Sequence, residues 1–125
     1  MIIIGIGIDA TEITRISEAI ERYGDRFIRR IFTEDEVAYC QRKRDFASSF
    51  AARFAAKEAA MKALGTGHSR GVFWQGIEVV RRGGPPGLRF HGGAAARFEA
   101  LGGTSAFLTL SHSRELALAQ VTLVR

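Results

Sequence analysis

The stretch from Arg53 to Gly65 constrains this chain most, because its composition predicts a helix with little alternative. Apart from Phe54, every residue before Gly65 is alanine, leucine, methionine, lysine, arginine or glutamate. These are strong helix formers, and no proline interrupts them. Gly65 then supplies a stop, since glycine readily adopts the left-handed conformation that ends helices.

An apolar stripe runs along this helix. Phe46, Phe50 and Phe54 recur every four residues, and Met61 and Leu64 continue the stripe at helical spacing. One face of the helix is therefore predicted to lie in the core.

The charges on the helix are placed unusually for a plain surface. Arg53 and Lys57 are an i,i+4 pair of like sign, which destabilises an isolated helix by about 0.2–0.5 kcal/mol. At about 100° per residue, Lys57 lies within the stripe and Glu58 borders it. Cations beside an apolar face suit a bound anion, and a carboxylate suits a cation. The ordinary alternative is that Glu58 and Lys62 form a helix salt bridge while Lys57 snorkels, and the helix by itself favours it.

Size and composition indicate one folded domain spanning residues 1–125. Hydrophobic residues make up 46% and charged residues 25%, which is typical of a globular protein rather than a disordered one. No apolar run reaches the roughly 20 residues of a membrane span, and the isoleucine-rich start lacks the basic region of a signal peptide. Cys40 is the only cysteine, so an internal disulfide is impossible and a reducing cytoplasm fits.

The chain is basic, with 18 lysines and arginines against 13 acidic residues and a net charge of +5. The basic residues cluster at positions 22–30 and 42–44. Guanidinium groups match phosphates and carboxylates, so phosphate-bearing or acidic partners are favoured. A nucleic acid, an acidic protein and a small polyphosphate all remain open at this point.

The N-terminal residues predict a strand with one buried face. Isoleucines at even positions 2–8 alternate with Ile3, Gly5, Gly7 and Asp9. The two glycines leave the Asp9 side bare, so backbone or ligand can approach closely there. Asp9 is expected to end the strand. The alternative makes it the N-cap of the next helix, with Glu12 completing a capping box.

The rest of the chain reads as alternating short elements without repeats or linkers. Thr33 and Glu36 form a clear capping box that opens a helix through about Cys40. His112 lies near a turn, where a histidine is more often solvated, and no serine-hydrolase elbow surrounds it. Helices are predicted at about 13–24, 25–31 and 94–101, and strands at 77–80, 88–90, 107–111 and 116–124, the last two joined as a hairpin by residues 113–115.

Several weak signals become specific when they are taken together and in order. The segments that carry this pattern are Gly5–Asp9 with Thr11-Glu12 and Arg15-Ile16, then Phe32–Glu36, then Arg53–Ala59 with Lys62-Ala63 and Gly65–Gly67, and finally Ser111–Ser113. In this order they resemble the motifs of the 4′-phosphopantetheinyl transferases across nearly the whole chain. The short length resembles the holo-[acyl-carrier-protein] synthase subgroup rather than the double-length, pseudo-dimeric one.

The resemblance implies both a fold and a reaction. The fold is α+β, with a mainly antiparallel sheet packed against a long central helix and shorter helices. The reaction moves 4′-phosphopantetheine from coenzyme A to a serine of apo-acyl carrier protein, releases adenosine 3′,5′-bisphosphate and supports fatty acid biosynthesis in the cytoplasm. Phosphoryl transfer needs mainly positioning and charge neutralisation, which basic and acidic side chains can provide.

The resemblance also assigns roles to individual residues. Asp9 and Glu58 would hold Mg²⁺, which prefers carboxylates plus substrate phosphates, and Lys62 would join them as a catalytic residue. Glu58, directly or through a metal-bound water, is our candidate for the general base. The residues implied to bind coenzyme A are Arg44, Arg53, Lys57, Lys62, Gly65, Pro86, His112 and Ser113.

Two partners follow from the resemblance and the charge pattern. The synthase subgroup forms homotrimers with active sites between subunits, which would let Arg53 and Lys57 face an anion at an interface. Acyl carrier proteins are acidic, so an arginine face is predicted to dock them, with no role for membrane or nucleic acid. That face comprises Arg15 and Arg22, which lie two turns apart on one helix, and the following pair Arg26 and Arg30.

Two alternatives stay open. One is a basic binding module for RNA or an acidic protein without catalysis, although the aromatic stacking motif of an RNA-recognition domain is absent. The other is a degenerate family member that binds coenzyme A inertly, against which the intact Asp9, Glu58 and Lys62 argue.

Overall fold

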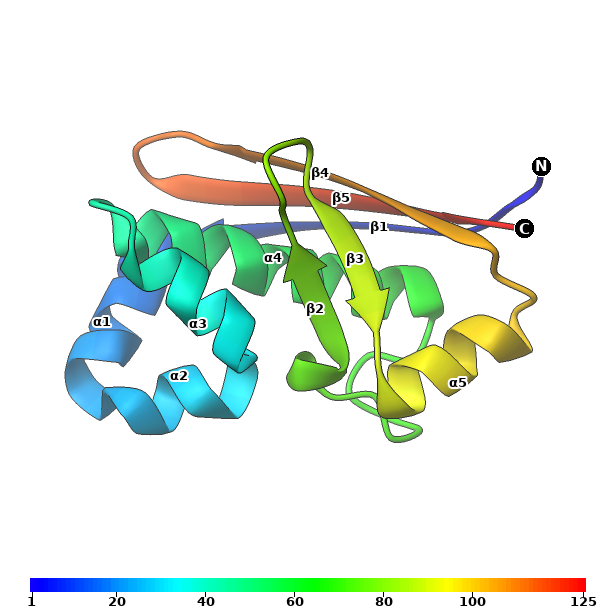
Figure 1. Ribbon diagram of the computed structural model, residues 1–125, viewed down its shortest axis with the longest axis horizontal. Helices are drawn as coiled ribbons and strands as arrows, with labels where there is room; N and C mark the ends of the chain where they lie inside the picture. The colour runs from blue at the N-terminus through cyan, green and yellow to red at the C-terminus, as the bar shows by residue number, and fades with distance from the viewer.

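The computed structural model describes all 125 residues. One strand and four successive helices are followed by two pairs of strands, with one helix between the pairs (Figure 1). In order they are β1 (Ile3–Glu12), α1 (Ile13–Tyr23), α2 (Asp25–Ile31), α3 (Glu34–Gln41), α4 (Phe46–Leu64), the 3₁₀ helix η1 (Trp74–Gly76), β2 (Ile77–Val80), β3 (Gly87–Phe90), α5 (Gly92–Ala100), β4 (Ser105–His112) and β5 (Leu116–Val124). None of the helices is both long and apolar enough to cross a membrane.

The three longest strands form an antiparallel sheet in the order β1-β5-β4, and α4 lies along it (Figure 1). A separate antiparallel hairpin, β2-β3, crosses in front of α4 in that view. Helices α1, α2 and α3 gather at one end of the molecule and α5 at the other. The predicted α+β fold, with antiparallel strands on a long central helix, is confirmed.

Strand β1 lies directly on the backbone of α4. A Cβ atom added to Gly7 would lie 1.9 Å from the carbonyl oxygen of Ala59, and one added to Gly5 would lie 2.0 Å from that of Ala63. Only glycine leaves room for a helix this close. The predicted close approach at the glycine side of β1 is therefore made by α4. Because Gly5 lies at Ala63 and Gly7 at Ala59, the strand and the helix run in opposite directions.

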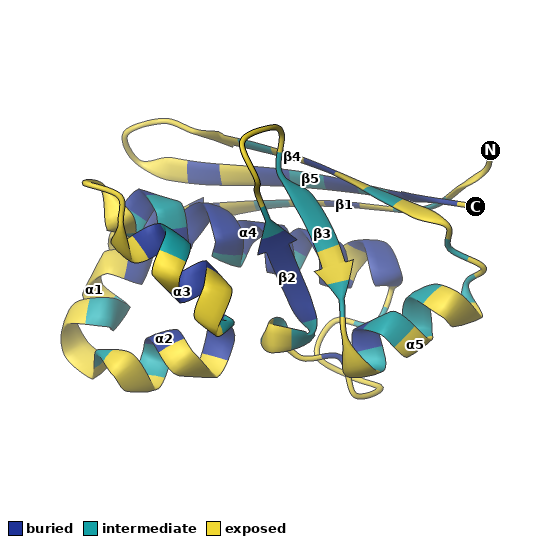
Figure 2. Ribbon diagram, viewed as in Figure 1, coloured by how far each residue is buried: buried dark blue, intermediate teal, exposed yellow.

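The isoleucine side of β1 faces away from α4 and is exposed. Ile6 and Ile8 are 60% and 63% exposed, and Phe107 and Leu118 on the same side of the sheet are 51% and 40% exposed. We call these four residues the apolar sheet face. In Figure 2, β5 alternates between buried and exposed segments, as expected of a strand with one covered face.

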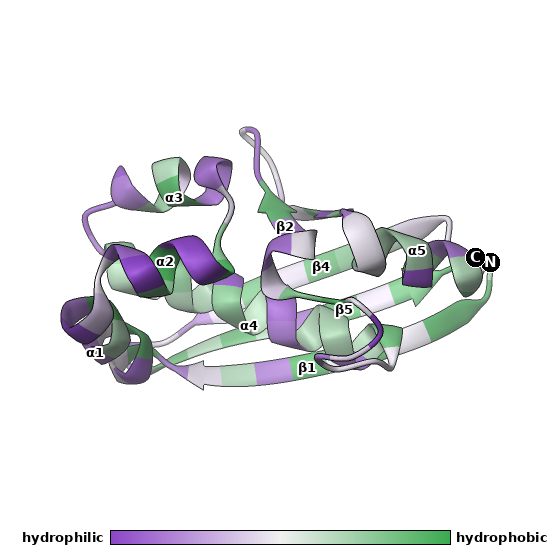
Figure 3. Ribbon diagram, turned by 90° about the horizontal axis from the view of Figure 1, so that it is seen from below, coloured by the Kyte–Doolittle hydropathy of each residue, from purple (hydrophilic) through white to green (hydrophobic).

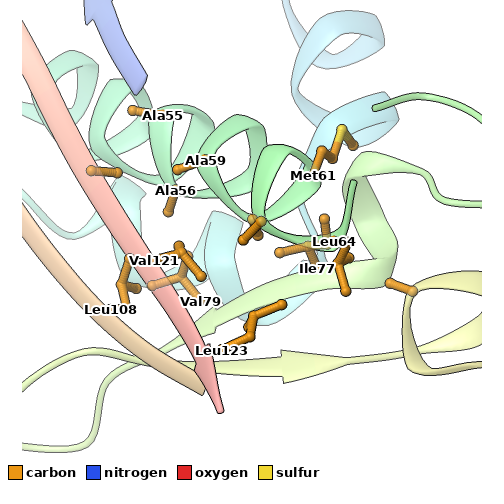
Figure 4. Packing of buried hydrophobic residues seen from close by; sticks show 14 of the residues in the cluster. Ala55, Ala56, Ala59, Met61, Leu64, Ile77, Val79, Leu108, Val121 and Leu123 are labelled. Carbon is orange, nitrogen blue, oxygen red and sulfur yellow. The ribbon is translucent and has the colours of Figure 1, made fainter. Parts of the chain in front are cut away.

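Helix α4 is buried almost all round rather than along one stripe. Phe50, Met61 and Leu64 are buried as predicted, whereas Phe46 is 46% exposed. Small alanines let the strands approach on the remaining sides, because they add no side-chain bulk. Figure 4 shows this packing, which joins α4 to the sheet and the hairpin. A helix buried all round is typical of the centre of a domain.

A second cluster fills the space between the N-terminal helices and the start of α4. It includes Ile16, Ile28, Phe32 and Phe50, with the Phe32 and Phe50 rings 4.8 Å apart. The outer sides of α1 and α2 carry hydrophilic segments (Figure 3). Both helices thus bury isoleucines on one side and expose polar residues on the other.

Most predicted element ends are confirmed. Thr33 and Glu36 form the capping box, with Glu36 N donating to Thr33 Oγ1 at 3.2 Å and Thr33 N to Glu36 Oε1 at 2.9 Å. Gly65 ends α4 with a φ of 75°. The expected end of the first strand at Asp9 is wrong, because β1 continues to Glu12. The alternative that Asp9 caps the next helix is wrong as well, since Glu12 is the N-cap of α1 and makes no side-chain hydrogen bond there.

Candidate active site

Asp9 on β1 meets Lys62 on α4. The ammonium Nζ of Lys62 donates to Asp9 Oδ1 at 3.2 Å and to the carbonyl oxygen of Ile8 at 2.8 Å. Asp9 Oδ2 accepts a hydrogen bond from Thr11 Oγ1 at 2.8 Å. Asp9 shares the inner side of β1 with Gly7, since side chains alternate along a strand. The glycine contact with α4 therefore brings the Asp9 carboxylate to the helix.

Glu58 lies one turn before Lys62 on α4, yet the two do not pair. Glu58 Oε2 instead accepts hydrogen bonds from His68 Nε2 and from Trp74 Nε1, both at 3.1 Å. Its side chain is 27% exposed. The ordinary helix salt bridge offered as an alternative is therefore wrong: Lys62 turns to Asp9 on the sheet, and Glu58 turns to the loop that follows α4.

The donor set fits a divalent cation that substrate phosphates help to hold. Asp9 on β1 and Glu58 on α4 each offer hard carboxylate oxygens, and no hydrogen bond reaches Glu58 Oε1. The structure contains no cluster of three or more acidic, histidine or cysteine side chains suited to a metal. Mg²⁺ is commonly bound through one or two carboxylates plus phosphates and water, so two carboxylates suffice.

Lys57 lies fully inside the protein. Its Nζ donates to Glu36 Oε1 at 2.7 Å, to the carbonyl oxygen of Ile77 at 2.6 Å and to that of Trp74 at 3.0 Å. Burial lowers the pKa of Lys57, and the charge and hydrogen bond of Glu36 oppose this effect. The side chain is 0% exposed, so the alternative that it snorkels is wrong.

The ammonium of Lys57 thus has an acceptor for each of its three protons, which ties α4 to α3 and to the start of β2. This geometry gives no support to the predicted contact of Lys57 with coenzyme A. Its neighbour in the like-charged pair, Arg53, is also buried, at 4% exposure. The two cations therefore contact different partners, Glu36 for Lys57 and Ser49 for Arg53, rather than one shared anion.

Arg53 borders a basic cavity of about 330 Å³. Its Nη1 donates to Ser49 O at 3.3 Å and to Ser49 Oγ at 3.1 Å, and its guanidinium lies 4.1 Å from the centre of the Tyr39 ring. The Nε of Arg53 is buried and has no partner, and such a donor needs explaining by water or a ligand. The cavity residues are Tyr39, Lys43, Arg44, Asp45, Ser48, Ser49, Ala52, Arg53, Arg81, Leu110, Ser111 and His112.

Three predicted residues, Arg44, Arg53 and His112, thus meet in one cavity. Sequence reasoning missed Tyr39 and Arg81, which no motif singled out. Burial raises the pKa of Tyr39, but hydrogen bonds and charges of Lys43 and Arg53 outweigh it and leave the pKa below its ordinary value. The cavity is therefore strongly cationic, as a phosphate site requires.

The cavity and the carboxylate pair lie on different sides of α4. Arg53 and Glu58 are five residues apart, which is about 140° around a helix of 3.6 residues per turn. One side of α4 therefore carries Glu58 and Lys62, of which Lys62 contacts Asp9, and another side carries Arg53 and its cavity.

The other predicted coenzyme A residues lie at turns. Gly65 caps α4, Pro86 precedes β3 in the hairpin turn, and Ser113 follows β4. Ser113 Oγ accepts hydrogen bonds from the backbone N–H groups of Glu115 and Leu116, at 3.3 and 3.1 Å. The structure therefore shows a turn-capping role for Ser113. Pro86 does not line the basic cavity around Arg53.

The four arginines predicted to dock a carrier protein are all exposed. Arg15 and Arg22 line one surface cavity of about 820 Å³ on α1. Arg30 on α2 lines another of about 710 Å³ together with His68 and Trp74, the two donors to Glu58. The arginine face thus extends to the residues that hold Glu58.

Comparisons with known proteins identify the family of this chain. A family model described as the 4′-phosphopantetheinyl transferase superfamily matches residues 5–119. A holo-[acyl-carrier-protein] synthase of Koribacter versatilis is 52% identical over 122 residues, covering 97% of this chain and 98% of the relative. Another, of Solibacter usitatus, is 50% identical with the same coverage.

Solved structures match as well. The holo-[acyl-carrier-protein] synthase of Neisseria meningitidis has a TM-score of 0.91 at 30% identity, covering 99% of this chain and 100% of the other. That of Helicobacter pylori, solved in complex with coenzyme A, has a TM-score of 0.84 at 28% identity, with coverages of 95% and 99%. Fold, motif residues and near full-length relatives agree, and this chain belongs to the 4′-phosphopantetheinyl transferase superfamily.

Proposed function

We propose that this protein is a holo-[acyl-carrier-protein] synthase, which transfers 4′-phosphopantetheine from coenzyme A to a serine of an apo-acyl carrier protein. The observation that carries the proposal is the meeting of Asp9 on β1 with Lys62 on α4, one turn from Glu58. These three residues belong to the motifs that define the resemblance. Relatives about 50% identical over nearly the whole chain carry the synthase name.

The reaction exchanges one bond to phosphorus for another. The serine oxygen of the carrier attacks the phosphorus that bears the pantetheine group, and the bond to adenosine 3′,5′-bisphosphate breaks. The serine proton passes to a base, for which Glu58, directly or through a metal-bound water, is our candidate. Mg²⁺ bound by Asp9 and Glu58 would neutralise charge on the pyrophosphate. Lys62 provides a further positive charge beside Asp9.

The basic cavity is proposed to hold the phosphate-bearing adenosine end of coenzyme A. Arg53, Arg44 and His112 lie on the cavity wall, and the buried Nε of Arg53 has no partner within the chain. Guanidinium groups bind phosphates through paired hydrogen bonds, which favours this assignment.

We further propose a homotrimer with active sites between subunits. Two observations support it. The apolar sheet face leaves four large side chains exposed, and contiguous apolar patches commonly mark protein interfaces. In addition, the basic cavity and the carboxylate pair lie on different sides of α4, so a neighbouring subunit could bring one group to the other.

The arginine face is proposed to receive the carrier protein. Its exposed guanidinium groups suit an acidic partner, and Arg30 shares a cavity with the donors to Glu58. A cytoplasmic role in fatty acid biosynthesis fits the buried, unpaired thiol of Cys40.

Product analysis tests the function. The protein is incubated with coenzyme A, Mg²⁺ and an apo-carrier protein, and the small molecules are separated by chromatography. We expect adenosine 3′,5′-bisphosphate to appear only when the apo-carrier protein is present. Binding of coenzyme A without release of this product would instead favour an inert family member, and binding of RNA alone would favour the non-catalytic basic module.

A further inference from the structure

Two hydrogen-bond donors converge on one oxygen of Glu58. His68 Nε2 and Trp74 Nε1 both lie 3.1 Å from Oε2, whereas no hydrogen bond reaches Oε1. An ionised carboxylate only accepts hydrogen bonds, so both nitrogens act as donors here. The two oxygens of Glu58 are therefore unequal: one is held by the protein and the other is left available.

The two donors are themselves fixed. The rings of His68 and Trp74 meet edge to face, with centroids 4.5 Å apart, and Trp74 lies 6.1 Å from the ring of Phe54 on α4. The carbonyl oxygen of Trp74 also accepts a hydrogen bond from buried Lys57. The indole is thus anchored on the same helix that carries Glu58.

The loop between α4 and η1 returns His68 to the helix. Gly65, Gly67, Arg70 and Gly71 all have positive φ angles, between 55° and 75°. These left-handed turns fold the loop back, so that His68 reaches Glu58 ten residues earlier in the chain. The contact is part of the loop geometry rather than a chance meeting of long side chains.

We propose that His68 and Trp74 are positioning residues for Glu58, which fix its carboxylate so that Oε1 is the oxygen available to the divalent cation. The inference rests on the proposed assignment of Glu58 as a metal ligand. Hydrogen bonds to a ligating carboxylate orient it before the cation binds, and the loss of such partners typically weakens metal affinity by about 10–100-fold.

The test measures binding of Mn²⁺ as a probe, by the loss of its free electron paramagnetic resonance signal. Protein is titrated in the presence of saturating coenzyme A, and a blank with coenzyme A alone is subtracted. We expect His68→Ala and Trp74→Phe each to raise the Mn²⁺ dissociation constant by about tenfold. His68→Gln should restore much of the affinity, because its side-chain amide can still donate to Oε2. The affinity for coenzyme A should stay within about twofold of the unaltered protein.

His91 provides a matched control. It donates from Nε2 to Glu78 at 3.0 Å and is 47% exposed, close to the 3.1 Å and 44% of the His68 contact. His91→Ala should therefore leave the Mn²⁺ dissociation constant unchanged, although it removes a similar histidine-glutamate contact.

Glu58→Ala separates two kinds of failure. If this variant binds Mn²⁺ as well as the unaltered protein, Glu58 is not a ligand, and both the proposed metal site and this inference are overturned. If Glu58→Ala weakens binding but His68→Ala and Trp74→Phe do not, the inference alone is wrong. The inference alone is also wrong if His91→Ala weakens Mn²⁺ binding as strongly as His68→Ala does.

Discussion

Lys57 and Glu36 form a fully buried ion pair, with 2.7 Å between Nζ and Oε1 and neither side chain exposed. Glu36 Oε2 also accepts a hydrogen bond from Val79 N at 2.9 Å, so the pair joins α3, α4 and β2. Lys57, which the sequence motif suggested as a phosphate ligand, thus forms a structural contact in the protein core. Removing one partner leaves the other charged and unpaired in the core.

Lys57→Met should therefore destabilise the fold by about 3–5 kcal/mol. The measurement is the free energy of unfolding in urea. Lys62→Met on the same helix is the control, because its pair with Asp9 is 57% exposed on the lysine side and such pairs contribute about 0–1 kcal/mol. Equal and small losses in the two variants would contradict a structural role for Lys57.

Glu78 should make the free energy of unfolding depend on pH in the acid range. Burial alone raises its pKa, but hydrogen bonds from His91 and Thr33, with the charges of His91 and Arg89, outweigh it and lower the pKa below the ordinary 4.5. A carboxyl group with a depressed folded-state pKa stabilises the fold above its unfolded value, and this contribution is lost as pH falls through the folded-state pKa.

Urea unfolding of the unaltered protein and of Glu78→Gln across pH 3–7 checks this. The stability difference between the two proteins should shrink as the pH falls below 4.5. A difference that stays constant through the acid range would show that Glu78 keeps an ordinary pKa.

The shared-site assembly predicts that two inactive variants can rescue each other. Glu58→Ala removes the carboxylate side and His112→Ala the basic cavity, and in a mixed trimer some sites would combine one intact group from each chain. We expect separate samples to be inactive and the mixture, after verified subunit exchange, to recover part of the activity. Light scattering should report a trimer, and an active monomer would refute the arrangement.

The arginine face predicts a selective kinetic defect. Replacing Arg15 and Arg22 by glutamate should raise the KM for the carrier protein by about tenfold, since surface charge mainly sets encounter rate and orientation. The KM for coenzyme A should hardly change. Raised salt should weaken transfer by the unaltered protein through screening. An unchanged KM for the carrier protein would place the docking face elsewhere.

The sequence predicted the elements well because its signals there are local. The helix formers of residues 53–64, the capping box at Thr33 and the glycine stop at Gly65 each act within a few residues. A close approach at the glycine side of β1 was also predicted from Gly5 and Gly7, although the sequence left open whether backbone or ligand would make it.

Tertiary contacts decided the features that the sequence left open. The alternating pattern of β1 predicted two different faces but did not show which one α4 covers. In the structure α4 covers the glycine face. The partner of Lys57 lies on α3, 21 residues away. Likewise, nothing near His68 in the sequence points to Glu58, because only the returning loop brings them together.

The most direct test of the account is the intact mass of an apo-carrier protein after incubation with coenzyme A, Mg²⁺ and this protein. We predict a mass gain of one phosphopantetheine per carrier, which is lost when a chelator removes the metal. Asp9→Ala and Glu58→Ala should each slow the gain by more than about a hundredfold, because charge stabilisation by a bound metal contributes several kcal/mol to the transition state.

Melting curves of the two variants, recorded beside the mass measurements, separate lost chemistry from lost structure. Loss of the Asp9 hydrogen bonds with Thr11 and Lys62 should cost only about 0.5–1.5 kcal/mol each. Full mass gain by both variants in Mg²⁺, or no gain by the unaltered protein with an apo-carrier that a known synthase modifies, would contradict the account.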